Sequence, residues 1–166
     1  NGLTGGNDSV IADINGAGYY LYDSTENLTL MGNTPFGVGN AQDNTLTGSA
    51  NGNFLLGGAG NDTLDYRSAN EGLSIVYSAA GTGVVSGALT GTDSFSAVET
   101  VYGSGRADTI TGSSGNDVLT WHAGAGGNDS FVGAPDNYGL KDTFALSTRQ
   151  YAVMSLQHLF SPSLIN

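Results

Sequence analysis

The stretch Gly57-Gly58-Ala59-Gly60-Asn61-Asp62-Thr63-Leu64-Asp65 decides the fold. Glycine reaches backbone angles that are closed to other residues, so its three glycines can turn carbonyl oxygens toward one point. Asp62 adds a carboxylate there, and Leu64 follows as the inward residue of a short strand. Ca²⁺ takes roughly six to eight oxygens at roughly 2.3–2.6 Å. One such loop cannot supply them all, so we expect a second loop to face the ion.

A nine-residue period extends from this stretch along the chain. When Asp62 is counted as the sixth position and Leu64 as the inward position, the predicted inward residues are Val10, Tyr19, Leu28, Gly37, Leu46, Leu55, Leu64 and Leu73. Two repeats make one coil, so alternate repeats stack on the same edge. The sixth positions of the first edge are Asp8, Glu26, Asn44 and Asp62. Those of the second edge are Ala17, Pro35, Asn53 and Glu71. The first edge is therefore better equipped to bind cations.

Composition narrows the classes of partner and of fold. The 166 residues fit one domain, and the 27 glycines with only three prolines exclude a collagen-like chain. A net charge of −11 disfavours nucleic acid and anionic membranes as partners, and no apolar run reaches the roughly 18 residues of a membrane span. There is no cysteine, so disulfides cannot stabilise the fold and bound metal is the remaining cross-link.

The period predicts four segments. Residues 1–73 form a first repeat block and 99–144 a second one, in which the phase is shifted by one residue. Between them, 74–98 read as irregular coils of the same solenoid, with longer strands at 74–77 and 83–86. The last segment, 145–166, contains apolar residues at roughly helical spacing. We expect a short helix over 148–160 that caps the open end of the solenoid or docks on another subunit.

The loops resemble those of the RTX (repeats-in-toxin) family of bacterial proteins, and the resemblance covers roughly residues 1–144. It implies an all-β right-handed parallel β-roll, export through a type I secretion channel, and folding on Ca²⁺ outside the cell. The phrases at 26–30 and 98–101 resemble the linking coils of large secreted RTX proteins. The predicted rod has about nine turns of about 4.8 Å each, and is thus about 40 Å long.

Carried onto this sequence, the resemblance and the loop pattern give one set of expected calcium ligands. These are Gly39, Asn44, Gly57, Gly58, Gly60, Asp62, Gly103, Gly105, Asp108, Gly112, Gly115, Asp117, Gly124, Gly126 and Asp129. The first expected ion lies between loops 39–44 and 57–62, with Asp43 as an additional candidate. If an insertion at 121–123 bulges outward, Asp129 stacks over Asp108. The alternative is that some loops keep the turn and have lost the ion.

No catalytic constellation emerges from the sequence. A Gly-x-Ser-x-Gly elbow is absent, and His122 and His158 have no companion at metal-ligand spacing. We therefore expect no enzyme activity, but a secreted, calcium-stabilised structural or adhesive module at the bacterial cell surface. Its expected partners are calcium, further copies of itself in a surface layer or filament, and surface polysaccharide. The alternative is the calcium-dependent module of a secreted protease, lipase or alginate epimerase, whose catalytic domain lies upstream.

Overall fold

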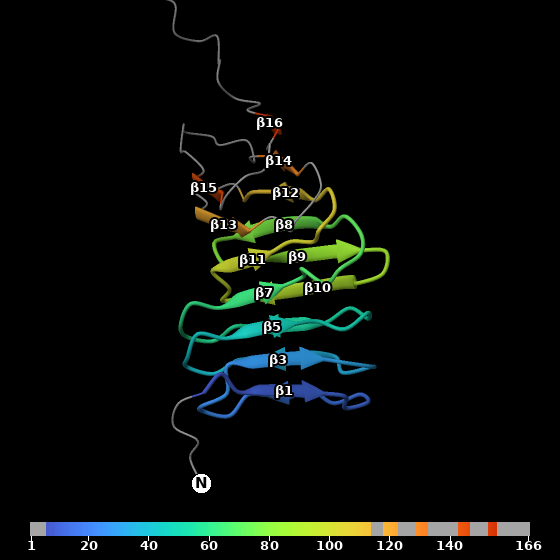
Figure 1. Ribbon diagram of the computed structural model, residues 1–166, viewed down its shortest axis with the longest axis vertical. Coiled ribbons are helices and arrows are strands. Elements are labelled where there is room, and N and C mark those ends of the chain that lie inside the picture. The colour runs from blue at the N-terminus through green and yellow to red at the C-terminus, as the bar shows by residue number, and fades with distance from the viewer. Residues whose placement is uncertain (1–5, 114–117, 123–128, 133–142, 147–152, 156–166) are drawn as a thin grey trace, which may run out of the picture.

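The computed structural model describes residues 6–113, 118–122, 129–132, 143–146 and 153–155. The elements in these ranges are all strands, stacked along the long axis of a rod (Figure 1). None of the described segments forms an apolar helix of membrane-spanning length. The strands make up two sheets, which enclose a narrow apolar core.

The seven-stranded sheet is parallel throughout, in the order β1-β3-β5-β7-β11-β13-β15. Its strands are β1 (Ser9–Ala12), β3 (Asn27–Leu30), β5 (Thr45–Thr47), β7 (Thr63–Asp65), β11 (Thr100–Tyr102), β13 (Val118–His122) and β15 (Thr143–Leu146).

The nine-stranded sheet has the order β16-β14-β12-β8-β9-β10-β6-β4-β2. Its strands are β2 (Tyr19–Tyr20), β4 (Phe36–Val38), β6 (Phe54–Leu56), β8 (Ser74–Ala79), β9 (Thr82–Gly87), β10 (Gly91–Ser96), β12 (Thr109–Thr111), β14 (Ser130–Val132) and β16 (Val153–Ser155).

The strand register confirms the nine-residue period over the first block. Leu28, Leu46 and Leu64 are partners on successive strands of the seven-stranded sheet, and Gly37 and Leu55 are partners on the other sheet. The leucines are fully buried, and burial of each such side chain contributes about 1.5–3 kcal/mol. Because alternate repeats stack on one another, the fold is the expected all-β parallel β-roll.

The segment between the two blocks differs from a regular coil. The longer strands expected at 74–77 and 83–86 are confirmed as β8 and β9, but β9 runs antiparallel to both β8 and β10. This insertion lies only in the nine-stranded sheet, since β7 pairs directly with β11 in the other. Figure 1 accordingly shows β9 at the height of β11 and β8 at the height of β13. The insertion therefore offsets the two sheets in the second block.

One predicted inward position, Leu73, differs by two residues from the one in the structure. Ile75, not Leu73, pairs with Ile110 and fills the core of β8, while Leu73 is buried at the strand entrance. Glu71 is consequently not a sixth-position residue. In the second block, Val101 pairs with Trp121, so β11 and β13 are offset by 20 positions in the chain and not by the 18 of the strict period.

The predicted C-terminal helix is also wrong where the structure describes it. Val153–Ser155 form β16, which pairs in parallel with β14, and the rest of residues 148–160 lies outside the described residues. Without β16, one edge of β14 would present unpaired N–H and C=O groups. Strand pairing satisfies these groups, and this outweighs the helical spacing of the apolar residues.

Candidate metal centre

The sixth-position side chains link successive coils by a ladder of hydrogen bonds. On the first edge, the backbone N–H groups of Asp8, Asn44 and Asp62 donate to Glu26, Asp62 and Glu99 at 2.8, 2.8 and 2.7 Å. On the second edge, those of Asn53, Leu73 and Asp108 donate to Asp93, Asp108 and Asp129 at 2.8, 2.7 and 3.0 Å. Each acceptor belongs to the next coil along the rod. The repeat's acidic residue is therefore a stacking group as well as a candidate ligand.

Three sixth-position side chains also close their own loop. The oxygen of Asn44 accepts from the N–H of Asn40 at 2.7 Å, and that of Asn53 accepts from Ser49 at 2.6 Å. Oδ2 of Asp108 accepts from the N–H of Ser104 at 3.0 Å. In each case the donor lies four residues earlier in the chain. Such side-chain to backbone bonds fix the bend in place of a backbone ladder.

Asp62 differs from these residues. Its Oδ1 accepts the hydrogen bond from Asn44, but Oδ2 is buried and has no hydrogen-bond partner in the described part of the chain. The residue as a whole is 1% exposed. A buried carboxylate oxygen without a donor costs several kcal/mol unless a cation or a proton neutralises it. The structure therefore has a specific place where positive charge is needed.

The pKa of Asp62 also indicates that positive charge is needed beside its carboxylate. The pKa of this carboxyl is raised to about 6, mainly by burial and additionally by the nearby carboxylates of Glu99 and Asp43. The hydrogen bond from the Asn44 N–H acts in the opposite direction. A divalent cation beside Oδ2 would favour the ionised form.

The glycines around Asp62 leave space that oxygen atoms line. A Cβ at Gly57 would collide with the carbonyl oxygen of Ala97 on the next coil and with Oδ2 of Asp62. Gly58 and Gly60 both have φ near +119°, which L side chains rarely adopt, so only glycine fits without strain. Ala97 itself has φ +51°, an uncommon angle for a residue with a side chain. Oδ2 of Asp62 and the Ala97 carbonyl thus approach one point from two coils.

The two loops expected to share the first ion do stack on each other. The N–H of Ala59 donates to the carbonyl of Asn40 at 3.1 Å, and that of Asn61 donates to Oδ1 of Asp43 at 2.8 Å. A Cβ at Gly39 would collide with the Gly57 carbonyl oxygen. The oxygen of Asp62 that lacks a donor lies, like the carbonyl oxygen of Ala97 on the coil that follows, close to the position that a Cβ at Gly57 would take.

These donor groups fit calcium, which binds through oxygen only and accepts backbone carbonyls together with carboxylates. In the described ranges, no three His, Cys, Asp or Glu side chains come together as a metal-binding group. The candidate oxygens near Gly57 are one carboxylate oxygen, Oδ2 of Asp62, and one main-chain carbonyl oxygen, that of Ala97. With Ca²⁺ bound, the ion would supply the positive charge that Oδ2 of Asp62 lacks.

In the second block, Asp129 lies over Asp108 as expected. Asp108 already has donors on both oxygens, because the Ser104 hydroxyl and the Leu73 N–H donate to Oδ1, each at 2.7 Å, and the Ser104 N–H donates to Oδ2. Of the expected glycine ligands, those at the described positions Gly103, Gly105 and Gly112 flank this carboxylate in sequence. Gly115, Asp117, Gly124 and Gly126 lie outside the described residues.

Sequence reasoning did not place Asp93, Glu99 and Ala97 in the site. Asp93 occupies a sixth position, since its Oδ1 accepts from Asn53 and Phe95 follows as the partner of Leu55. The triplet Asp93-Ser94-Phe95 carries that signal, but the inserted hairpin hides which coil it stacks on. Ala97 contributes a carbonyl, which no residue type reveals.

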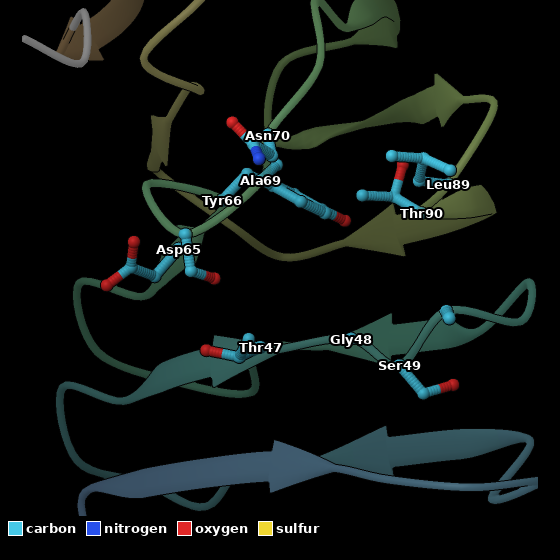
Figure 2. A pocket seen from close by; sticks show the side chains of 11 residues that line it. Thr47, Gly48, Ser49, Asp65, Tyr66, Ala69, Asn70, Leu89 and Thr90 are labelled. Carbon is cyan, nitrogen blue, oxygen red and sulfur yellow. The ribbon is translucent and has the colours of Figure 1, made fainter.

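One pocket of about 240 Å³ lies on the second edge, where the insertion separates neighbouring loops (Figure 2). Its lining comes from three segments, 47–50, 65–70 and the turn at 89–90. The only carboxylate among its lining residues is Asp65, which forms an ion pair with Arg67. The pocket is thus lined mainly by hydroxyl, amide and small apolar groups, and it is distinct from the oxygen-lined space at Gly57.

Comparison with known families settles what these loops are. The model of the RTX calcium-binding nonapeptide repeat, built from four copies, matches residues 38–70, 94–126 and 102–139. The chain contains RTX calcium-binding nonapeptide repeats. RTX nonapeptide repeats bind Ca²⁺, form a non-catalytic structural module, and are characteristic of type I secreted extracellular proteins. No curated protein and no solved structure matches this RTX chain. The matched segments include loop 57–62 and loop 103–108.

Proposed function

We propose that this RTX chain is a structural module whose coils are fixed in place by calcium, with Asp62 as the principal ligand. The observation that carries the proposal is the buried Oδ2 of Asp62, which lacks a donor and lies at the oxygen-lined space beside Gly57. Asp62 also accepts the N–H of Asn44 from the previous coil. One side chain therefore joins a cation and a neighbouring coil, which couples calcium binding to coil stacking.

The proposed ligand set extends the same geometry to related loops. Around Asp62 it consists of Gly57, Gly58 and Gly60, with the Ala97 carbonyl added from the next coil. Gly39 and Asn44 form the weaker neighbouring position, because Asn44 carries no charge. In the second block the proposed set is Gly103, Gly105, Asp108, Gly112 and Asp129, followed by Gly115, Asp117, Gly124 and Gly126. Asp108 has donors on both oxygens, as Asp93 has, but a second carboxylate, Asp129, is stacked on it, and a cation would relieve the repulsion between the two.

The free energy that calcium binding adds to stability would make folding depend on the calcium concentration. Extracellular calcium modules bind with dissociation constants of about 10⁻⁴–10⁻³ M, so millimolar calcium adds about 1 kcal/mol per site. Cytosolic calcium, at micromolar levels or below, adds almost nothing. Three sites would contribute about 3–4 kcal/mol, a large share of the roughly 5–15 kcal/mol by which a domain is stable. The module would accordingly fold after export.

The proposed role is adhesive or structural at the bacterial cell surface, with self-assembly into a surface layer or filament and surface polysaccharide as the possible partners. In support, the sheets stack as a rod whose end strands each have one neighbour among the described strands, β1 and β2 at one end and β15 and β16 at the other. Such ends are able to pair with further strands. The alternative is the calcium-dependent module of a secreted enzyme that is catalytic elsewhere. The open reading frame upstream of this chain distinguishes the two roles.

Calcium titration by isothermal calorimetry tests the site. We expect Asp62→Asn to bind one ion fewer than the wild type, because an amide cannot supply the second anionic oxygen. Asp23→Asn, at an exposed aspartate, is the matched control and should keep every ion. In addition, a chelator should reduce the β-sheet circular dichroism signal substantially. An unchanged ion count in Asp62→Asn, or an unchanged spectrum in the chelator, would contradict the proposal.

A further inference from the structure

We infer that the hydroxyl of Tyr66 takes, at Asp93, the place that a cation takes at Asp62, so that the coil containing β10 closes without metal. The inference rests on the proposed calcium site at Asp62. It divides the rod into a metal-dependent part and a part that carries its own donor.

Asp93 and Asp62 are equivalent by position. Oδ1 of each accepts the backbone N–H of an asparagine on the previous coil, Asn53 or Asn44, at 2.8 Å. In both coils, the residue after the aspartate donates its N–H to the carbonyl of the same asparagine, also at 2.8 Å. Both aspartates are 1% exposed. Oδ1 therefore accepts the same kind of hydrogen bond between coils in both places.

The second carboxylate oxygen, Oδ2, distinguishes Asp93 from Asp62. Oδ2 of Asp93 accepts a hydrogen bond from the Tyr66 hydroxyl at 2.7 Å, whereas Oδ2 of Asp62 has no partner among the described residues. Tyr66 is only 4% exposed, so this donor is held inside the protein. Figure 2 shows its side chain reaching inward from the loop after β7. A hydroxyl that donates to a carboxylate makes one of the stronger hydrogen bonds in proteins.

The usual donor is unavailable to Asp93, which explains why a tyrosine is needed. At Asn44, Asn53 and Asp108 the N–H four residues earlier closes the loop, and for Asp93 this residue is Leu89. Its N–H instead donates to Oε1 of Glu71 at 2.7 Å, as part of a clasp that also holds the N–H groups of Ala88 and Thr90. The antiparallel insertion thus takes away the loop donor, and Tyr66 replaces it from the neighbouring loop.

The absence of a side chain at Gly48 completes the arrangement. A Cβ there would lie 2.7 Å from Oδ2 of Asp93 and 2.9 Å from Oδ1 of Asn53. The corresponding space at Gly57 faces an oxygen without a donor, whereas this one faces oxygens that already have donors. A cation at Gly48 would therefore have to displace existing hydrogen bonds.

The coils that precede Asp93 on the second edge follow the same rule. Nδ2 of Asn53 donates to the carbonyl of Thr34 at 2.7 Å, and the buried Thr34 hydroxyl donates to the carbonyl of Ala12 at 3.1 Å. Amide and hydroxyl donors of the chain thus connect these coils. The Tyr66–Asp93 pair continues this metal-free series across the insertion.

Two measurements on the full chain test the inference. In calcium titrations, Asp93→Asn should keep the wild-type number of ions, because an amide at this position can still accept from Asn53 and can donate to the Tyr66 oxygen. Loss of an ion in Asp93→Asn would overturn the inference. Retention of every ion in Asp62→Asn would instead refute the proposed calcium site, and the inference would then be decided by the second measurement.

The second measurement is amide hydrogen exchange in a chelator. We expect residues 91–96 to remain protected in the wild type while residues 57–65 exchange rapidly. Tyr66→Phe should speed exchange at 91–96 by about tenfold, the equivalent of one lost hydrogen bond. Tyr22→Phe makes the same change at an exposed tyrosine and should have no effect. Equal exchange of the two segments in the wild type, or no effect of Tyr66→Phe, would overturn the inference.

Discussion

The backbone N–H of Asn44 donates to Oδ1 of Asp62 at 2.8 Å, although the two residues are 18 positions apart in the chain. The bond leaves only Oδ2 of Asp62 to face a cation. In the proposed mechanism, calcium therefore does not merely fill a loop. By holding Asp62 ionised and in position, it also fixes the acceptor on which the preceding coil stacks.

Glycines with unusual backbone angles should be required in the loop before β7. Gly60→Ala should lower the free energy of unfolding by about 1–3 kcal/mol, since φ is near +119° and the new Cβ would lie 2.7 Å from the Gln42 carbonyl oxygen. Gly6→Ala is the control, because its Cβ would make only an ordinary contact, 3.8 Å from Oδ1 of Asp8. Urea denaturation at saturating calcium measures both. Equal stability of the two variants would contradict the strained conformation.

The narrow core should be sensitive to truncation. Leu46 has no exposed surface, and we expect Leu46→Ala to lower the free energy of unfolding by about 2–5 kcal/mol. Leu89→Ala removes the same atoms from a side chain that is 65% exposed, and should change the free energy of unfolding by no more than about 0.5 kcal/mol. Urea denaturation again provides the comparison. A small loss in Leu46→Ala would show that the coils are held by their edges and not by their core.

Asp93 should make stability depend on pH. Burial raises its pKa to about 6, against 3.8 in the unfolded chain, so the folded state holds a proton that the unfolded state releases. This contribution is fully present below the unfolded pKa and is lost as the pH rises through about 6. Its size is about 2–3 kcal/mol.

Denaturation of wild type and Asp93→Asn across pH 4–7, at saturating calcium, isolates this effect. The amide does not titrate, so the stability of Asp93→Asn relative to the wild type should increase as the pH rises through this range. Parallel pH profiles for the two proteins would show that Asp93 titrates normally in the folded state.

Glu71 should hold the turn between β9 and β10. Its carboxylate accepts the N–H groups of Ala88, Leu89 and Thr90, and these bonds keep the pKa of Glu71 below its usual value. We expect Glu71→Gln to speed amide exchange at residues 88–90. In the wild type, this protection should be lost as the pH falls through the lowered pKa of Glu71, because protonation removes the charge. Exchange at 88–90 that is independent of both changes would contradict the clasp.

The sequence by itself determined the period and the chemistry of the loops. Gly58 and Gly60 indicate bends that other residues cannot make, and Asp62, two residues after Gly60, indicates an oxygen ligand. Leu28, Leu46 and Leu64 recur at 18-residue intervals because each must enter the same narrow core. The constraints on the loop are local, so neighbouring residues in the sequence reveal them.

Only the tertiary structure decided which coils neighbour each other after residue 73, and so which carboxylate lacks a donor. The hairpin β8–β9 places β10 against β6, and that contact brings Tyr66 to Asp93, 27 residues away in the chain. Likewise, the Ala97 carbonyl approaches Asp62 because β11 pairs directly with β7. Nine-residue counting cannot foresee these contacts. They depend on how edge strands satisfy their backbone hydrogen bonds, which is settled between distant segments and not within one repeat.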